Sequence, residues 1–231
     1  MNYVVLLSGG TGTRVGLKIP KQYYIVNDRS VISYVIESIE KVREIDGYII
    51  VASREWEDFI SKEVDKHFPN GKFLGFANPG ETRQLSIING LVKIGDWAKE
   101  DDLIIIQDAA RPNTSSKIYQ QCITLSDGED GAMPVLPMKD TVYMSKTGKK
   151  IDSLVNRDEI YAGQAPESFR YGKYFEANKR LSTEEIAKIK GSTEPAVMYG
   201  MNIKMFDGDE YNFKITTEND LKRFVDLQKE R

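Results

Sequence analysis

The sequence predicts an α/β fold built on a mostly parallel central sheet, with helices on both faces. Short apolar runs alternate with longer segments whose apolar residues recur at helical spacing. Strands that are apolar throughout are typical of parallel sheets covered on both sides. With 231 residues, 40% of them hydrophobic, the chain is long enough for one large domain with a substantial core. We therefore expect residues 1–231 to form a single domain.

Each expected element follows from its own local pattern. Buried strands are expected at 3–7, 48–52, 102–107 and 131–135, a short edge strand at 72–76 and a late strand at 202–206. Amphipathic helices are expected at 30–42, 56–68, 82–94, 117–126, 169–181, 184–189 and 219–228. The run Pro69-Asn70-Gly71 ends the second of these helices.

The pattern changes between residues 140 and 161. Two short strand-like runs, 141–145 and 150–155, flank the turn Thr147-Gly148-Lys149. Two such runs around a glycine turn predict a β-hairpin. We expect this segment to be an arm that stands off the domain.

A glycine-rich stretch, Ser8–Arg14, directly follows the first expected strand. Glycines permit positive φ angles and leave backbone N–H groups bare, so such a loop can bind a phosphate. Arg14 and Lys21 place two cations beside it, which suits a polyphosphate. The loop is not a Walker loop, because no Gly-Lys-Ser/Thr follows, and Val15 stands where a dinucleotide-binding loop needs its third glycine. On the glycines alone, an ordinary strand-to-loop turn remains the alternative.

Two further polar stretches begin where an expected element ends or starts. Asp108 follows a buried strand, where its carboxylate could hold Mg²⁺ beside nucleotide phosphates or simply cap a turn. The run 80–86 opens a helix, and its Arg83 or Ser86 could reach a base or ribose, or serve only the helix start. Because ligands of parallel sheets bind beyond the carboxyl ends of the strands, the glycine loop and Asp108 predict one common site.

Composition excludes several classes of function. A net charge of −3 gives no overall basic field, so nucleic acid is not an expected partner. The single cysteine, Cys122, excludes an internal disulfide and a cysteine zinc site, and its helical spacing predicts a core residue. The only histidine, His67, is expected to be structural or exposed. No apolar stretch is long enough for a membrane span and no signal-peptide pattern is present, so a cytosolic, soluble protein is expected.

Taken together, the motifs resemble those of the CTP-dependent cytidylyltransferases of the 2-C-methyl-D-erythritol 4-phosphate and ribitol 5-phosphate type. The matching stretches run in the family's order across nearly the whole chain. They are residues 9–14, 20–23, 80–86, 108–112, 140–141, Arg157, Gln164 with Pro166, and 212–217. Their joint occurrence is specific, whereas each stretch alone is weak.

The resemblance implies a Rossmann-like nucleotidyltransferase fold whose arm helps to form a homodimer. It also implies transfer of CMP from CTP to a polyol phosphate, with Mg²⁺ as cofactor and pyrophosphate as the second product. The acceptor phosphate is already ionised at neutral pH, so the reaction needs no strong base. The lack of a usable histidine or cysteine is therefore no obstacle.

The resemblance assigns roles residue by residue. The catalytic positions are Arg14, Lys21, Asp108 and Lys214, and Asp108 is also the implied metal ligand. The implied nucleotide-binding positions are Ser8, Gly9, Gly10, Thr11, Gly12, Thr13, Gly80, Arg83, Ser86 and Ala109. The implied acceptor-binding positions are Arg111, Thr141, Arg157 and Gln164, with Arg157 on the arm and directed to the partner subunit's site. A second metal ligand is not assigned.

The sequence departs from the family near the expected acceptor pocket. Ala165 and Glu167 stand where the family usually has Thr and Gln, and Ser192-Thr193-Glu194-Pro195 replaces a Thr-Asp-Glu-Ala-like stretch. The stretch 156–159 is more typical of the ribitol branch. The expected acceptor is therefore ribitol 5-phosphate or a related alditol or glycerol phosphate, with methylerythritol phosphate as the alternative. A sugar-1-phosphate nucleotidyltransferase using another base and a non-catalytic nucleotide-binding protein are the remaining alternatives.

Overall fold

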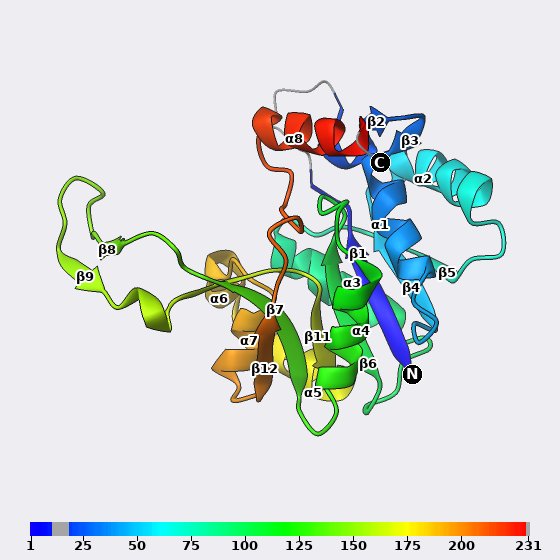
Figure 1. The fold of residues 1–231 in the computed structure, drawn as a ribbon. Coiled ribbons are helices and arrows are strands. Elements are labelled where there is room, and N and C mark those ends of the chain that lie inside the picture. Colours follow the sequence, from blue (N-terminus) through cyan, green and yellow to red (C-terminus); the bar gives the residue numbers. More distant parts are fainter. Residues whose placement is uncertain (11–18, 230–231) are drawn as a thin grey trace.

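A single eight-stranded sheet runs through the centre of the molecule (Figure 1). The computed structural model describes residues 1–10 and 19–229. The strands follow the order β10–β7–β11–β6–β1–β4–β5, and β12 pairs with β7. Their bounds are β1 Asn2–Leu7, β4 Gly47–Val51, β5 Phe73–Ala77, β6 Leu103–Asp108, β7 Gly131–Pro137, β10 Tyr161–Gly163, β11 Glu167–Arg170 and β12 Ile203–Asp207.

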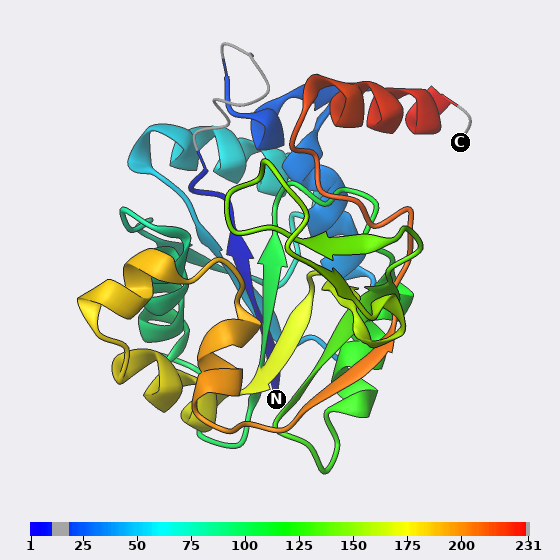
Figure 2. The ribbon, with the colours of Figure 1, turned by 90° about the vertical axis from the view of Figure 1, so that its left-hand side faces the viewer.

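Most neighbouring strands are parallel, as the sequence predicts. The pairs β1 with β4, β1 with β6, β4 with β5, and β7 with β12 all run parallel. The exceptions are β10 and β11, which run antiparallel to the strands beside them. In Figure 2 the arrowheads of β1 and β6 point toward the end of the molecule on which the last helix lies.

Helices cover both faces of this sheet. The face under α1 (Val31–Glu40), α2 (Arg54–His67) and α4 (Ser116–Leu125) holds one apolar cluster, which includes Val4 and Leu6 of β1. The opposite face, under α3 (Arg83–Ile94), α5 (Tyr171–Lys179) and α7 (Thr193–Met198), holds a second cluster that includes Tyr3 and Val5. Because side chains alternate along a strand, β1 is buried on both faces.

Shorter elements complete the chain. They are a helical turn at Lys21–Tyr23, β2 Ile25–Val26, β3 Arg29–Ser30, a helical turn at Arg157–Glu159, α6 Thr183–Lys188 and α8 Glu218–Lys229. A third apolar cluster packs α8 against Val26, Val31 and Ile215. Cys122 lies fully buried as a free thiol, which confirms its expected place in the core.

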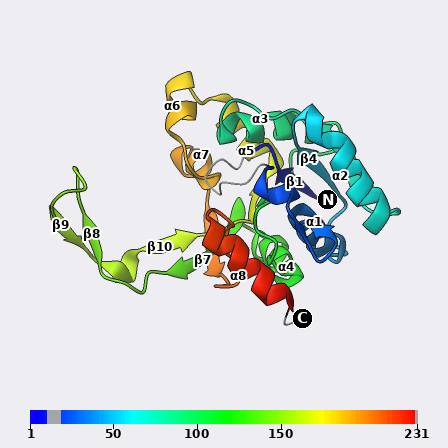
Figure 3. The same ribbon diagram turned by 90° about the horizontal axis from the view of Figure 1, so that it is seen from above.

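The expected arm is present as a two-stranded hairpin. Val142–Met144 (β8) pairs antiparallel with Ser153–Val155 (β9), and Gly148 adopts a φ of 69° in the turn between them. Seen from above, the arm and α2 lie at opposite sides of the molecule (Figure 3). Among the described residues, β8 and β9 pair only with each other and form a separate two-stranded sheet, so the hairpin stands off as an arm.

The helix expected at 169–181 is wrong at its start. Residues 167–170 form the strand β11, and α5 begins only at Tyr171. The strand is inserted between β6 and β7, with Phe169 opposite Ile104 and Gly131. Burial on both faces of the sheet therefore overrides the helical spacing of its apolar residues.

Candidate active site

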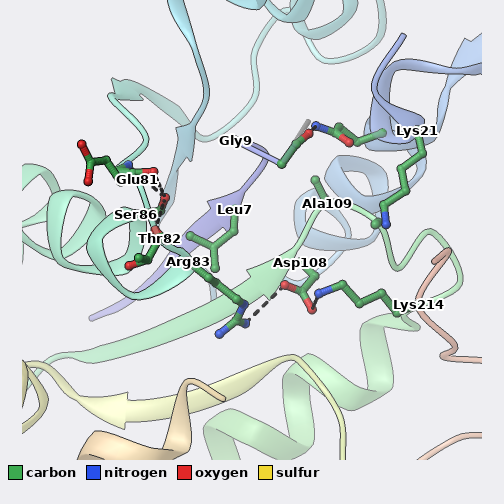
Figure 4. Close-up of a pocket in the computed structure, with 14 residues that line it drawn as sticks. Leu7, Gly9, Lys21, Glu81, Thr82, Arg83, Ser86, Asp108, Ala109 and Lys214 are labelled. Atoms are coloured by element: carbon green, nitrogen blue, oxygen red, sulfur yellow. Dashed lines mark hydrogen bonds and ion pairs between the residues drawn. The ribbon is translucent and has the colours of Figure 1, made fainter. Parts of the chain in front are cut away.

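A cavity of about 440 Å³ lies at the carboxyl ends of β1 and β6 (Figure 4). This is the size range of small-molecule sites, and its place agrees with the rule for parallel sheets. Its lining combines backbone of the glycine loop, the start of α3, the end of β6 and two lysines. The lining residues are Leu7, Gly9, Gly10, Lys21, Gln22, Gly80, Glu81, Thr82, Arg83, Ser86, Asp108, Ala109, Ala110 and Lys214.

The described part of the glycine loop is held by side chains of the turn that carries Lys21. Nε2 of Gln22 donates to the carbonyl oxygens of Ser8 (2.8 Å) and Gly10 (2.7 Å). The hydroxyl of Tyr23 also contacts the Ser8 hydroxyl and carbonyl. The Pro-Lys-Gln-Tyr stretch thus fixes the loop and places Lys21, 8% exposed, in the cavity wall. Thr11, Gly12, Thr13 and Arg14 lie outside the described residues.

The expected positive φ angles are absent at Gly9 and Gly10. Gly9 is required for another reason, since a Cβ there would lie 2.6 Å from the side chain of Pro79. Gly80 has a similar constraint, because a Cβ there would lie 2.2 Å from the Cβ of Leu85. Both glycines therefore permit close approach of the loop before α3 to its neighbours.

The start of α3 brings two expected residues to the cavity. The N–H of Gly80 donates to Oγ of Ser86 at 3.0 Å, and Thr82 caps the helix through the N–H of Leu85. Arg83, the first residue of the helix, directs its guanidinium toward Asp108 (Figure 4). The helix start therefore presents both a polar backbone edge and a cation to the same space.

Asp108 is the anionic centre of the site. Its Oδ2 lies 3.0 Å from Nζ of Lys214 and 3.5 Å from Nε of Arg111, and its Oδ1 lies 3.3 Å from Nη2 of Arg83. Burial alone would raise the pKa of Asp108, but Arg83, Lys214 and Arg111 together hold it well below its ordinary value. The carboxylate is therefore ionised at neutral pH, and the cations exceed it in charge. The surplus positive charge suits a polyanionic ligand.

The loop after β12 carries Lys214 and is tied down by Asn212. The Asn212 side chain donates to the carbonyl of Ala165 and accepts from the Thr114 hydroxyl, both at 2.8 Å. The backbone carbonyl of Asn212 accepts from Nη1 of Arg111 at 2.6 Å. Arg111, expected to bind the acceptor, thus contacts both Asp108 and this loop.

Gln164, the second expected acceptor-binding residue, is buried and faces the same loop. Its Nε2 donates to the carbonyl of Asp209 at 2.9 Å, and its Oε1 accepts from the N–H of Asp209 at 3.1 Å. Both ends of the amide are therefore engaged by backbone. Gln164 lies behind the loop that presents Lys214, and it does not line the cavity.

Thr141 and Arg157 lie at the base of the arm, and both are exposed. Nη1 of Arg157 donates to the carbonyl of Lys139, the residue just before the arm, at 2.8 Å. Neither residue lines the cavity of its own chain. The other expected residues that the structure describes fall into two groups. Those that line the cavity are Gly9, Gly10, Lys21, Gly80, Arg83, Ser86, Asp108, Ala109 and Lys214. Arg111 lies next to the cavity through its contact with Asp108, and Ser8 is buried with its hydroxyl against Tyr23.

Two residues near the cavity were not assigned a role from the sequence. Ser192, just before α7, accepts a hydrogen bond from Nη1 of Arg83 at 2.8 Å. Glu167, the first residue of β11, is buried close to the same guanidinium. The departure from the family pattern at both positions was the available signal, but nothing in the sequence links them to Arg83.

The donor set around Asp108 limits the kind of metal that it could hold. Among the described residues, no group of three or more His, Cys, Asp or Glu side chains lies close enough to bind a metal ion. A single carboxylate beside a phosphate site suits Mg²⁺, which usually keeps water and phosphate oxygens as its other ligands. The site therefore fits a metal that arrives with a nucleotide.

No helix among residues 1–10 and 19–229 is long and apolar enough to cross a membrane.

The family model "IspD: 2-C-methyl-D-erythritol 4-phosphate cytidylyltransferase" matches residues 2–225. A protein of that name from Clostridium perfringens is 31% identical over 218 residues, 94% of each chain. A ribitol-5-phosphate cytidylyltransferase from Lactiplantibacillus plantarum is 28% identical over 225 residues, 96% of each chain.

Solved structures agree with these matches. The crystal structure of the 2-C-methyl-D-erythritol 4-phosphate cytidylyltransferase of Francisella tularensis superposes with a TM-score of 0.80 at 25% identity. The superposition covers 98% of this chain and 99% of that one. The family match spans the glycine loop, Asp108 and Lys214 alike. The chain therefore belongs to the IspD family and is a CTP-dependent cytidylyltransferase.

Proposed function

We propose that the chain transfers CMP from CTP to a polyol phosphate, giving a CDP-polyol and pyrophosphate. The observation that carries this proposal is the convergence of Lys21, Arg83 and Lys214 with Asp108 on one cavity beside the glycine loop. A triphosphate needs its charge neutralised and its orientation fixed, and this cluster supplies both.

In the proposed reaction an acceptor phosphate oxygen attacks the α-phosphorus of CTP. A new P–O bond forms as the bond from the α-phosphorus to the bridging oxygen breaks, and pyrophosphate leaves with that electron pair. The attacking oxygen is already ionised, so no protein group has to accept a proton. Lys21 and Lys214, together with Arg14, would stabilise the charge that builds on the α-phosphate and the leaving group.

The nucleotide would lie along the start of α3. The backbone around Gly80 and the hydroxyl of Ser86 would contact the base and ribose, while Arg83 and the glycine loop would contact phosphates. Asp108 would hold Mg²⁺, which when bound would neutralise phosphate charge as a Lewis acid. The three cations that contact Asp108 would then have the phosphates of CTP as a further anionic partner.

For the acceptor we propose ribitol 5-phosphate or a related alditol or glycerol phosphate. Arg111 and Thr141 would contact it, in agreement with the family resemblance. The second candidate is 2-C-methyl-D-erythritol 4-phosphate. Relatives named for this acceptor are 27–31% identical, and two named for ribitol 5-phosphate are 25% and 28% identical. Both acceptors end in the phosphate that the chemistry requires.

We further propose that residues 1–231 form one domain, and that two copies of the chain form a homodimer through their arms. A two-stranded hairpin is marginal by itself, and this one exposes apolar side chains. They are Tyr143, Met144, Ile151, Leu154 and, at its base, Tyr161. Packing against a second copy would cover them and bring Arg157 to the partner's cavity.

Because CTP and polyol phosphates are charged metabolites, we place the enzyme in the cytoplasm.

Pyrophosphate release tests the acceptor. The enzyme is incubated with Mg²⁺, CTP and one acceptor at a time: ribitol 5-phosphate, methylerythritol 4-phosphate, glycerol 2- or 3-phosphate, or a sugar 1-phosphate. The proposal expects turnover with ribitol 5-phosphate or a related alditol or glycerol phosphate. Turnover confined to methylerythritol 4-phosphate would select the second candidate. Turnover confined to sugar 1-phosphates would contradict both.

A further inference from the structure

The segment that presents Lys214 to the cavity leads directly into the C-terminal helix. Nζ of Lys214 contacts Asp108 (Figure 4), and the next residue, Ile215, is fully buried. The N–H of Ile215 donates to the carbonyl of Ala110 at 2.8 Å, which joins this segment to the loop after β6. The capping contacts of α8 begin just beyond it. The position of the lysine therefore depends on how the residues that follow it are held.

One carboxylate oxygen holds the backbone and the hydroxyls of two successive threonines. Oδ2 of Asp220 accepts from the N–H (2.9 Å) and from the hydroxyl (2.8 Å) of Thr216. It also accepts from the N–H (2.8 Å) and from the hydroxyl (2.9 Å) of Thr217. An ionised carboxylate only accepts hydrogen bonds, so both hydroxyls donate to it. Hydrogen bonds to a charged acceptor are stronger than neutral ones, and Asp220 therefore fixes both threonines to α8.

Part of this arrangement is an ordinary helix start. Thr217 directly precedes α8, and its hydroxyl accepts from the N–H of Asp220 at 3.2 Å, while the Asp220 carboxylate accepts from the N–H of Thr217. This reciprocal pair is a capping box, with aspartate in place of the usual glutamate or glutamine. The contacts to Thr216 lie outside the box, because that residue precedes the cap. They extend the hold of the carboxylate toward Lys214, and the helix start does not require them.

A second capping box, at the start of α6, has the same chemistry away from the site. Glu185 accepts from the N–H and from the hydroxyl of Ser182, both at 2.8 Å, and its own N–H donates back to that hydroxyl at 3.3 Å. Helix α6 contributes none of the described residues that line the cavity. The two helix starts therefore share their capping contacts and differ in how close they lie to a site residue along the chain.

Helix α8 packs against the segment that follows the other lysine of the cavity. Its buried apolar side chains belong to the third apolar cluster, which also includes Ile215 and Val26. Tyr24 packs against this cluster, and Tyr24 and Val26 follow Lys21 in the chain after the turn that carries it. A residue that ties the Lys214 segment to α8 therefore also fixes Lys214 relative to Lys21.

We propose that Asp220 is a positioning residue, which holds residues 216–217 on α8 and thereby fixes Lys214 for the reaction at the α-phosphate. The inference rests on the proposed function, because that function places Lys214 against the charge that develops there. A donor fixed in advance stabilises that charge without rearranging during the reaction. A displacement of about 1 Å can lower a rate about a hundredfold, so a carboxylate that never touches substrate can still control turnover.

The test measures kcat and KM for CTP in Asp220→Asn and Thr216→Val, by pyrophosphate release with Mg²⁺ and a saturating concentration of the acceptor that gives turnover. Asp220→Asn removes the charge, and Thr216→Val removes the hydroxyl contact outside the capping box while the box stays intact. We expect kcat to fall about tenfold in Asp220→Asn and about threefold in Thr216→Val. KM for CTP should change less than about twofold, because the contact of Lys214 that is lost is made in the transition state.

Two comparisons separate positioning from a general loss of stability, with every variant assayed at a temperature at which thermal unfolding shows it to be folded. Glu185→Gln is the matched control, because it makes the same change of charge in the capping box of α6. It should lower thermal stability and leave kcat unchanged. In the Lys214→Ala background, Asp220→Asn should lower kcat no further, because the lysine that it positions is gone.

Wild-type kcat in both Asp220→Asn and Thr216→Val would overturn the positioning role and leave the proposed function intact. An equal loss of kcat in Glu185→Gln would overturn it too, as would a full further effect of Asp220→Asn on top of Lys214→Ala. If Asp220→Asn does not fold, Thr216→Val with and without Lys214→Ala decides the question. Absence of turnover by the wild-type chain with CTP and every acceptor would overturn the proposed function, and this inference with it.

Discussion

Nζ of Lys214 lies 3.0 Å from Oδ2 of Asp108, although one residue follows the last strand of the chain and the other ends a central strand. Arg83 and Arg111 approach the same carboxylate from a helix start and from the loop after β6. Three cations on one buried carboxylate would repel one another without it. A triphosphate can serve as their further anionic partner, and this arrangement underlies the predictions that follow.

Replacing Lys21 by alanine should abolish most turnover without unfolding the protein. Lys21 lies in the cavity wall, and the contacts of its neighbours Gln22 and Tyr23 with the glycine loop remain in the variant. We expect kcat to fall about 10²–10³-fold, the usual effect of losing one preorganised donor. Pyrophosphate release measures this. Lys41→Ala is the control, because Lys41 is exposed and its ion pair with Glu37 lies outside the cavity. Near-normal turnover of Lys21→Ala would disprove the role of Lys21.

Gln164→Ala should resemble a loss of Lys214 rather than a loss of acceptor binding. The Gln164 amide is engaged by the backbone of Asp209, at the start of the loop that carries Lys214. Leaving those buried groups unpaired should cost about 1–3 kcal/mol of unfolding free energy and lower kcat. Denaturant unfolding and kinetics with varied acceptor check this. A raised KM for the acceptor, with kcat and stability intact, would instead support direct contact with the acceptor.

The junction before α8 should make stability depend on pH. Burial would raise the pKa of Asp220, but hydrogen bonds from the backbone and hydroxyls of Thr216 and Thr217 lower it to about 2. Because the pKa of Asp220 in the folded state lies below its unfolded value of about 3.9, the ionised carboxylate stabilises the protein at pH values above about 3.9. This contribution is lost as pH falls toward 2.

The test is unfolding free energy against pH for wild type and Asp220→Asn. We expect the variant to be less stable by about 1–2 kcal/mol above pH 5, after discounting for solvent screening. The difference should shrink as pH falls from about 4 toward 2. A difference that stays constant across this range would show that the Asp220 charge does not matter.

Mixed dimers should reveal whether the arm completes the partner's site. If Arg157 acts in the partner's site, the Arg157→Ala homodimer and the Lys21→Ala homodimer are each nearly inactive. A heterodimer with one subunit of each variant has one site that contains neither change. Random mixing makes about half of the dimers heterodimers, so about one quarter of wild-type activity should return. No recovery after confirmed subunit exchange would contradict action of Arg157 in the partner's site.

The sequence predicts the parallel core well because each parallel strand is a local signal. Runs such as 3–7 and 103–106 are apolar throughout, and their stable place is between two layers of helices. The same logic places the glycine loop and Asp108 at one end of the sheet, and the structure brings both to one cavity. The arm was also predictable, since its glycine turn and its two short runs are contiguous in the chain.

Features that depend on distant partners were not predictable. The helix expected at 169–181 included residues 169–170, and only pairing between β6 and β7 makes 167–170 a strand. Gln164 matches a binding motif, but its orientation depends on a loop more than forty residues later. The contact between Arg83 and Ser192 joins two helix starts that no local pattern relates.

The most direct test of the account is pyrophosphate release from CTP, compared with UTP, ATP and GTP at saturating acceptor and Mg²⁺, with CTP affinity measured in parallel by calorimetry. The account predicts that CTP binds in the presence of Mg²⁺, that pyrophosphate and CDP-polyol form in equal amounts, and that the other nucleotides give little product. Absence of CTP binding, or equal turnover with a purine nucleotide, would contradict it.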